Sequence, residues 1–224
     1  MDTARHILFF VKAPVRGQVK TRLAAALGED AALELHRSFA LDLLTTIDAT
    51  GIPSQVFYTP ADARDAVADW LGQHRTYSPQ AGSGLGSRME NAFRSAFAAG
   101  APRAVLIGSD LPDLPGEVFG EAFLALDEHD AVIGPARDGG YYLIGFRKDT
   151  FLPGVFPAMA WGTDRVFQET LDRFKAAGSR VRILREWQDV DTAEDLTGLR
   201  ERARGTAFER SATMTAIDGL YGRI

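Results

Sequence analysis

Short apolar runs alternate with stretches of helical periodicity along almost the whole chain. Strand-like runs lie at 6–12, 55–58, 104–108, 130–134, 141–146 and 180–184. Helical patterns lie at 19–27, 30–49, 61–72, 87–99, 115–128, 164–177 and 193–203, the last two with Asp164 and Thr192 as expected N-caps. Strands separated by helices favour parallel pairing, because each crossover helix covers a face of the sheet. We therefore predict an α/β fold with three layers and a mainly parallel, doubly wound sheet.

The length of the chain is ordinary for one domain of this kind, at 224 residues. The sequence contains no internal repeat, low-complexity tract or linker that would divide it. We predict a single domain over residues 1–203. Residues 204–224 are predicted to be a C-terminal tail, because their apolar positions follow no clear period.

Composition excludes several classes of function. The chain has no cysteine, which rules out thiol catalysis, disulfides and iron–sulfur clusters. Its net charge of −5 argues against a general nucleic-acid-binding protein, since such domains carry a basic surplus. The first apolar run, 7–11, is too short for a signal peptide, and no run approaches transmembrane length. We expect a cytoplasmic protein with no membrane insertion and no nucleic-acid partner.

Unusual polar segments follow several predicted strands. They lie at 12–22, 109–110, 135–140 and 189–191. In a doubly wound sheet, ligands bind outside the carboxyl ends of the strands. We expect all four segments to meet at that edge.

A basic loop follows the first strand. Lys12, Arg16, Lys20 and Arg22 fall within eleven residues, with Gly17 between them. A tight loop that leads into a helix offers free backbone N–H groups as well as these charges, which together suit a phosphate. The segment lacks the spacing of a P-loop. The alternative interpretation is a solvated basic loop with no ligand.

Carboxylates follow two other strands. Asp110 comes directly after a buried run, and Asp191 lies in an Asp-Val-Asp segment that begins at Asp189. Carboxylates at such an edge suit a hard cation, Mg²⁺ or Mn²⁺, which also binds ligand phosphates. Alternatively, Asp110 caps the following turn. The stretch from Thr192 to Asp195 has the form of a capping box, which does not account for the two preceding acids.

Two glycine-containing segments are further candidates. In Asp138-Gly139-Gly140, the glycines would let the backbone approach a ligand and Asp138 would supply a carboxylate, although a plain hairpin turn has the same pattern. In the glycine-rich segment 82–89, Arg88 is placed to reach a ligand. The four histidines are scattered and are expected to be structural or exposed.

Together these segments resemble an uncharacterised bacterial family of the nucleotide-diphospho-sugar transferase superfamily, which has the glycosyltransferase-A fold. The matching stretches are Lys12-Ala-Pro, Gly17, Lys20-Thr-Arg-Leu23, Leu85-Gly86, Arg88-Met89, Gly108-Ser-Asp110-Leu-Pro112, Asp138-Gly-Gly-Tyr-Tyr142 and Asp189-Val-Asp191-Thr. The resemblance implies that Asp110 is the carboxylate for metal and diphosphate and that Asp191, or Asp189, is the second metal contact. This chain departs from the family pattern at Arg16 and Gly84.

The combined expectation is a metal-dependent, glycosyltransferase-like enzyme that uses Mg²⁺ or Mn²⁺. Its donor would be a nucleotide sugar, bound through Lys12, Lys20 and Arg22, and Asp138 would act as base toward a small-molecule acceptor. One alternative is a nucleotidyltransferase that uses a nucleoside triphosphate, as phospholactate guanylyltransferase does. The other is a non-catalytic nucleotide-binding protein. The sequence leaves a homodimer open.

Overall fold

Seven strands form a single sheet, and the computed structural model describes residues 5–221. The strands are β1 (His6–Lys12), β2 (Ser54–Thr59), β3 (Tyr77–Pro79), β4 (Arg103–Ile107), β5 (Ala131–Pro135), β6 (Tyr141–Arg147) and β7 (Val181–Ile183). They lie in the order β3-β2-β1-β4-β6-β5-β7. β6 runs antiparallel to its neighbours β4 and β5, and the other pairs are parallel. The predicted mainly parallel sheet is confirmed.

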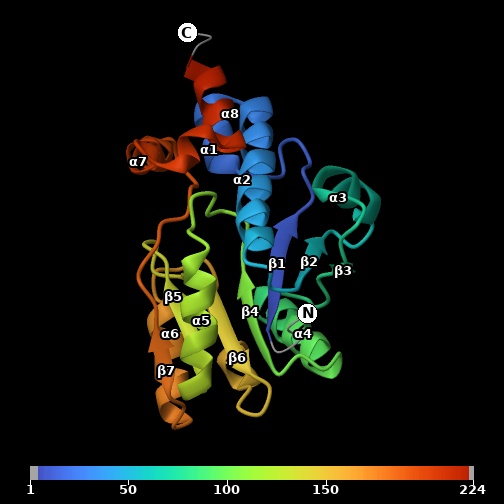
Figure 1. Cartoon of the computed structure of the whole chain (residues 1–224), viewed down its shortest axis with the longest axis vertical. Coiled ribbons are helices and arrows are strands. Elements are labelled where there is room, and N and C mark those ends of the chain that lie inside the picture. The colour runs from blue at the N-terminus through green and yellow to red at the C-terminus, as the bar shows by residue number, and fades with distance from the viewer. Residues whose placement is uncertain (1–4, 222–224) are drawn as a thin grey trace.

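Helices cover both faces of this sheet and one of its ends (Figure 1). They are α1 (Thr21–Leu27), α2 (Glu29–Ala49), α3 (Arg64–Leu71), α4 (Leu85–Ala98), α5 (Glu117–Glu128), α6 (Val166–Ala176), α7 (Ala193–Ala203) and α8 (Ala212–Tyr221), with 3₁₀ turns η1 (Pro153–Val155) and η2 (Ala207–Arg210). One core packs the sheet against α2, α3 and α5, and the other packs it against α4 and α6. Within residues 5–221, no helix is long and apolar enough to cross a membrane.

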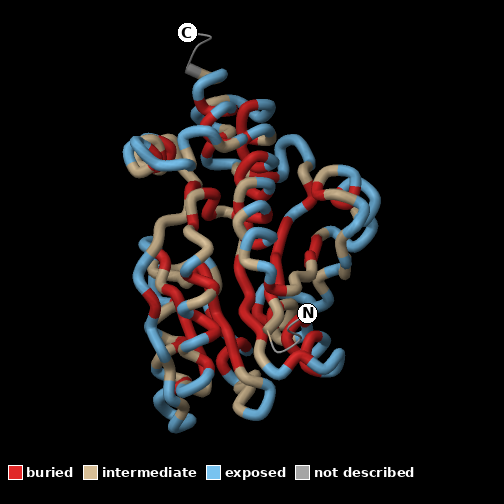
Figure 2. Tube along the Cα trace, in the orientation of Figure 1, coloured by how far each residue is buried: buried red, intermediate tan, exposed pale blue. Residues whose placement is uncertain are grey.

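The central strand β1 explains the first apolar run of the sequence. Ile7, Phe9 and Val11 face the core under α2 and α5, whereas Leu8 and Phe10 face the core under α4. A strand covered on both faces needs apolar residues at every position, and a half-exposed strand would alternate. Figure 2 shows the resulting pattern, with buried strands inside and exposed helix surfaces outside.

The reversed strand β6 is the part of the topology that the sequence pattern does not reveal. It brings Tyr141 to the edge at which β1 and β4 end. In its middle, Gly145 lies between the neighbouring strands, where an added Cβ would be 2.6 Å from Val105 Cγ1 and 2.8 Å from Val132 Cγ1. A side chain at this position would collide with both valines, so that they or the backbone would have to shift.

Helix boundaries agree with the predictions to within a few residues, but one predicted cap and one edge strand differ. The helix predicted to begin at Asp164 begins at Val166 after an N-cap at Arg165, and no side chain caps it. The short edge strand β3 lies where the sequence suggests only a loop. The predicted capping box is confirmed, since Thr192 accepts a hydrogen bond from the Asp195 backbone N–H.

The C-terminal segment forms a helix that packs at the end of α2. α8 shares a third core with α1, α2 and α7, and Figure 1 shows these helices together beyond the carboxyl edge of the sheet. The Asp42 carboxylate of α2 accepts hydrogen bonds from the backbone N–H groups of Ala212 at 3.1 Å and Thr213 at 2.7 Å. A side chain of α2 therefore caps α8, a role that local sequence patterns do not reveal.

Removing this cap should weaken the C-terminal core. We expect Asp42→Ala to lower the free energy of unfolding by about 1 kcal/mol, because two helix N–H groups lose their acceptor. Asp42→Asn is the matched variant and should cost less, since its amide oxygen still accepts. Urea denaturation of the three proteins measures the difference. Equal midpoints for wild type and Asp42→Ala would show that the cap contributes nothing.

Candidate functional site

A cavity of about 440 Å³ opens at the carboxyl edge of the sheet, where β1 and β4 end. We call it the basic cavity. Its lining consists of Phe10, Val11, Lys12, Gln18, Val19, Lys20, Thr21, Arg22, His36, Thr59, Gln80, Leu85, Arg88, Gly108, Ser109, Asp110 and Asp191. The predicted basic loop and both predicted metal carboxylates therefore border one space.

Lys20 is the centre of this cavity's charge network. Its Nζ lies 2.6 Å from Asp110 Oδ1 and 2.8 Å from Asp191 Oδ1, and it donates to the Val190 carbonyl at 2.8 Å. Only 3% of the Lys20 side chain is exposed, and its ammonium also faces the ring of Phe39 at 5.4 Å. The backbone of Lys20 is left-handed, with φ of 46°. A non-glycine residue in this conformation is strained, and the contacts of its side chain hold it there.

The protonation states of this network follow from opposing effects. Burial alone would lower the pKa of Lys20, but attraction from Asp110 and Asp191 outweighs it and raises that pKa above its usual value. Burial would likewise raise the pKa of Asp110, but Lys20 holds it below its usual value. The Lys20–Asp110 pair therefore consists of an ammonium and a carboxylate. Nearby, His36 Nε2 donates to the Lys12 carbonyl at 3.0 Å, which makes this histidine structural, and burial lowers its pKa.

A further acid, Asp189, lies beside this network without a cation of its own. Its Oδ1 is buried and has no hydrogen-bond partner. Burial, together with the nearby charges of Asp110, Asp138 and Asp191, raises the pKa of Asp189 to about 8. A buried carboxylate oxygen without a partner is costly and needs a cation or a proton donor.

A second cavity, of about 270 Å³, adjoins the first. We call it the aromatic cavity. Its lining consists of Phe10, Leu85, Met89, Leu106, Gly108, Asp138, Gly140, Tyr141, Tyr142, Trp161, Gly162, Thr163, Val166 and Asp189. The two cavities share Phe10, Leu85 and Gly108 as a common wall. The arrangement can hold two molecules side by side, with the acids near their junction.

The walls of the aromatic cavity are held by contacts between distant segments. The rings of Tyr141 and Trp161 meet edge to face at 6.1 Å. Gly139, with φ of 86°, packs so closely on the next loop that an added Cβ would lie 2.2 Å from the Asp164 carbonyl oxygen. The backbone N–H of Gly140 donates to Asp138 Oδ1 at 2.9 Å. This turn therefore fixes the Asp138 carboxylate at the cavity's rim.

Comparison with known proteins shows the family to which this chain belongs. Residues 42–163 match the bacterial family described as "Uncharacterized protein conserved in bacteria (DUF2064)". A crystal structure from Desulfovibrio desulfuricans G20, described as a "putative nucleotide-diphospho-sugar transferase", is 42% identical to this chain, with a TM-score of 0.94 over 100% of this chain and 98% of that one. The chain belongs to this bacterial family. No curated protein matches it.

More distant structures share the fold. The 4-diphosphocytidyl-2C-methyl-D-erythritol synthase of Anaerococcus prevotii DSM 20548 is 14% identical, with a TM-score of 0.56 over 90% of this chain and 97% of that one. A CMP:2-keto-3-deoxy-manno-octonic acid synthetase complexed with CTP is 12% identical, with a TM-score of 0.53 over 88% of this chain and 97% of that one. The fold of this family member is therefore of the nucleotide-diphospho-sugar transferase type.

The structure brings most of the predicted site residues to the two cavities. The basic cavity is lined by Lys12, Lys20, Arg22, Arg88, Asp110 and Asp191, and the aromatic cavity by Asp138 and Gly140. Gly139 lines neither cavity and packs against the backbone of Asp164.

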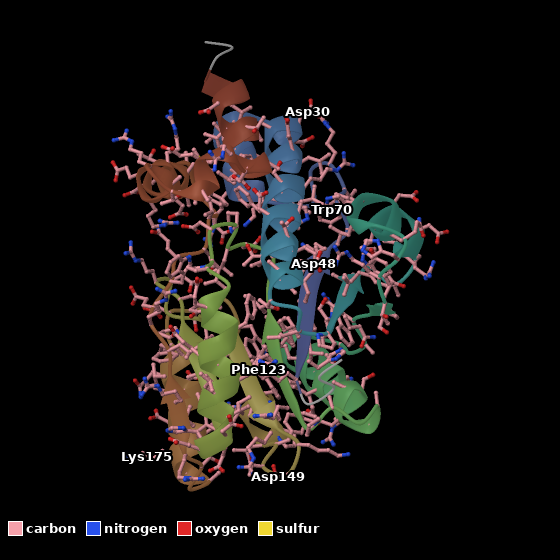
Figure 3. All side chains as sticks on the ribbon, viewed as in Figure 1. Asp30, Asp48, Trp70, Phe123, Asp149 and Lys175 are labelled. Carbon is pink, nitrogen blue, oxygen red and sulfur yellow. The ribbon has the colours of Figure 1, made fainter. Side chains whose placement is uncertain are left out.

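Arg16 and Gly17 lie elsewhere on the basic loop. Arg16 pairs with Glu29 at 2.5 Å and Asp30 at 2.6 Å, and an added Cβ on Gly17 would also approach Glu29. Asp30 lies at the upper end of α2 (Figure 3). Arg16 thus connects the basic loop to α2 through two ion pairs. Arg16 lines neither cavity.

Sequence reasoning missed several lining residues. Thr59, the last residue of β2, and Gln80, which follows β3, line the basic cavity, where Arg88 Nη1 lies 3.5 Å from Thr59 Oγ1. Thr59 directly follows the predicted strand at 55–58, which was a usable signal under the same sheet-edge rule, whereas β3 was not predicted and Gln80 therefore carried no such signal. Trp161 lies in a loop far from any predicted strand end, so only the folded chain shows its place.

Replacing Lys20 should destabilise the folded protein, because Asp110 and Asp191 would lose the cation that they share. We expect Lys20→Met to lower the free energy of unfolding by about 2 kcal/mol, because it leaves Asp110 and Asp191 facing each other without a cation. Lys12→Met, on the same loop but exposed, should change stability by less than about 0.5 kcal/mol. Urea denaturation in the presence of a metal chelator compares them. If both variants match wild type, the lysine does not hold the site together.

Proposed function

We propose that this protein is a divalent-metal-dependent transferase with a nucleotide-diphosphate donor in the basic cavity and an acceptor in the aromatic cavity. One observation carries the proposal: Lys20 contacts both Asp110 and Asp191 in the basic cavity, which shares a wall with the aromatic cavity. Cations suit the donor phosphates, and carboxylates suit a metal ion between donor and acceptor.

A nucleotide sugar is the donor that we favour. The relative from Desulfovibrio desulfuricans is described as a "putative nucleotide-diphospho-sugar transferase", and its likeness extends over the whole chain. The more distant synthetase complexed with CTP supports the use of this fold for nucleotides. In the basic cavity, Lys12, Arg22 and Arg88 would bind the phosphates, and Thr59 and Gln80 offer hydrogen bonds to a sugar or base.

The acid cluster fits Mg²⁺ or Mn²⁺ that is bound together with phosphate. Among residues 5–221, no group of three or more His, Cys, Asp or Glu side chains is arranged to hold a metal ion alone. Magnesium in phosphate-binding enzymes commonly takes one or two carboxylates and completes its coordination with water and substrate oxygens. Asp110 and Asp191 would hold the ion, and the unpartnered Asp189 oxygen lies beside them. A bound ion would neutralise charge on the leaving diphosphate.

The chain's own residues would then act on the two substrates. The acceptor hydroxyl would lose its proton to Asp138 while its oxygen bonds to the anomeric carbon. The bond from that carbon to the diphosphate oxygen breaks, and the diphosphate leaves with the electron pair. Lys20 and Arg22 would stabilise the charge that develops on it, as fixed cations in a partly buried site.

Nucleotidyl transfer is the second candidate, and the number of cations favours it. Lys12, Lys20, Arg22 and Arg88 border one cavity, which would also suit the greater charge of a nucleoside triphosphate. In that reaction an acceptor oxygen attacks the α-phosphorus and pyrophosphate leaves. Product analysis separates the candidates, because sugar transfer releases a nucleoside diphosphate.

The metal site is tested through Asp110. We expect Asp110→Asn to weaken Mn²⁺-dependent binding of the preferred nucleotide or nucleotide sugar at least tenfold and to lower turnover more than a hundredfold, on the order of one lost charge-assisted ligand interaction. Calorimetric titration of UDP-, GDP- and CDP-sugars and of the nucleoside triphosphates, with and without Mn²⁺, measures binding. Asp149→Asn is the matched control, since Asp149 pairs with Arg147 at the opposite end of the molecule (Figure 3).

Two outcomes would contradict the proposal. Equal affinity of wild type and Asp110→Asn, with both variants folded by circular dichroism, would remove the metal site. Tight nucleotide binding without release of nucleoside diphosphate or pyrophosphate, over a broad acceptor panel, would favour a non-catalytic nucleotide-binding protein.

A further inference from the structure

The aromatic cavity differs from the basic cavity in its charge. No lysine, arginine or histidine occurs among its lining residues within the described part of the chain, whereas two carboxylates, Asp138 and Asp189, do. The basic cavity next to it has five basic side chains. An anionic molecule would therefore meet no cationic side chain in the aromatic cavity.

Neighbouring cations are engaged elsewhere. Arg173 on α6 donates to the carbonyls of Val155, Pro157 and Ala158, which holds the loop that leads to Trp161. Lys20 is bound to acids on the side of the basic cavity.

The arginines on the flanking loops are also paired. Arg137 bonds to Gln188 and lies 3.3 Å from Glu186, and Arg165 is 3.9 Å from Glu169. Arg185 stacks on the ring of Trp187 at 4.9 Å. None of these side chains lines the aromatic cavity.

We infer that the acceptor is an uncharged or cationic compound with a ring, and that phosphorylated and carboxylated acceptors are excluded. This inference rests on the proposed function only in naming the occupant of the aromatic cavity the acceptor. The specificity comes from the absence of a cationic side chain that would compensate a buried anion, and from repulsion by the Asp138 carboxylate.

The acidic side chains of the aromatic cavity would be satisfied by a hydrogen-bond donor on the ligand. Asp189 Oδ1 is buried without a partner, so a ligand hydroxyl or ammonium would satisfy it. Asp138 uses Oδ1 for the Gly140 N–H, which holds the carboxylate in place. A donor group on the acceptor would therefore be drawn toward the acids, the position from which its oxygen or nitrogen can attack.

The apolar part of the aromatic cavity is the reason that we infer a ring in the acceptor. Trp161 and Tyr141 meet at right angles, and the Tyr141 hydroxyl lies 3.9 Å from Met89 Sδ, so both rings are braced. Aromatic side chains held in this way offer a flat surface to a sugar, phenyl or alicyclic ring, and also attract a cation.

The charge of the acceptor also distinguishes the two candidate reactions. Nucleotidyltransferases that join a nucleoside triphosphate to a phosphorylated compound need cations around the acceptor phosphate. The aromatic cavity supplies none. Transfer to a hydroxyl or amine is compatible with it, which favours transfer from a nucleotide sugar.

Three probes of nearly the same shape test the charge preference: tyrosol (uncharged), tyramine (cationic) and 4-hydroxyphenylacetate (anionic). The chain has three tryptophans, so ¹⁵N-labelled full-length protein gives three indole N–H signals, and Trp161→Phe assigns the relevant one. We expect tyrosol and tyramine to shift the Trp161 signal saturably, while Trp70 and Trp187 stay in place. The anion should bind at least about tenfold more weakly.

The double variant Asp138→Asn/Asp189→Asn supplies the matched control. It keeps the shape of the cavity and should narrow the difference in affinity between tyramine and 4-hydroxyphenylacetate by at least about threefold, because the repelling carboxylate of Asp138 is removed. The inference is overturned if the anion binds wild type as well as tyrosol does, if the difference is unchanged in the double variant, or if no probe shifts Trp161. Because these titrations need no nucleotide, they can succeed while the Asp110→Asn test fails, and the reverse.

Discussion

The ammonium of Lys20 joins three segments that are far apart in the chain. It contacts Asp110 after β4 and both Val190 and Asp191 after β7, and the Val190 backbone N–H donates to the Asp110 carbonyl at 3.0 Å. These contacts link the loops after β4 and β7 to the start of α1 at the carboxyl edge of the sheet. The same contacts keep Lys20 in a left-handed backbone conformation at the start of α1. The positions of the basic loop and of the acids depend on one another through this side chain.

The sequence predicts the fold and the edge at which the site lies, because apolar runs, helical periods and the sheet-edge rule are local signals. It does not predict the partners of Lys20, since Asp191 is 171 residues away and a lysine carries no sign of its left-handed backbone. The reversal of β6 is also hidden, because a buried strand has the same apolar pattern in either direction. The helix α8 escapes prediction since its cap, Asp42, belongs to α2.

The two adjoining cavities have different linings, and each suits one of the two substrates of the proposed reaction. The basic cavity offers fixed cations to phosphates, and the aromatic cavity offers rings and acids to a molecule that carries no negative charge. An ion held by the acids at their junction would reduce the repulsion that raises the pKa of Asp189. The family resemblance gives the fold and the location, and the linings of the cavities supply the chemical argument about the substrates.

The central claim is that the acids around Lys20 form a metal-and-phosphate site. Anomalous diffraction from crystals grown with Mn²⁺ and a bound nucleotide tests it most directly. The account predicts a manganese peak in contact with the Asp110 carboxylate and a nucleotide phosphate, with Asp191 or Asp189 beside it. A nucleotide bound in the basic cavity with no manganese at Asp110, or manganese bound only elsewhere on the protein, would contradict the account.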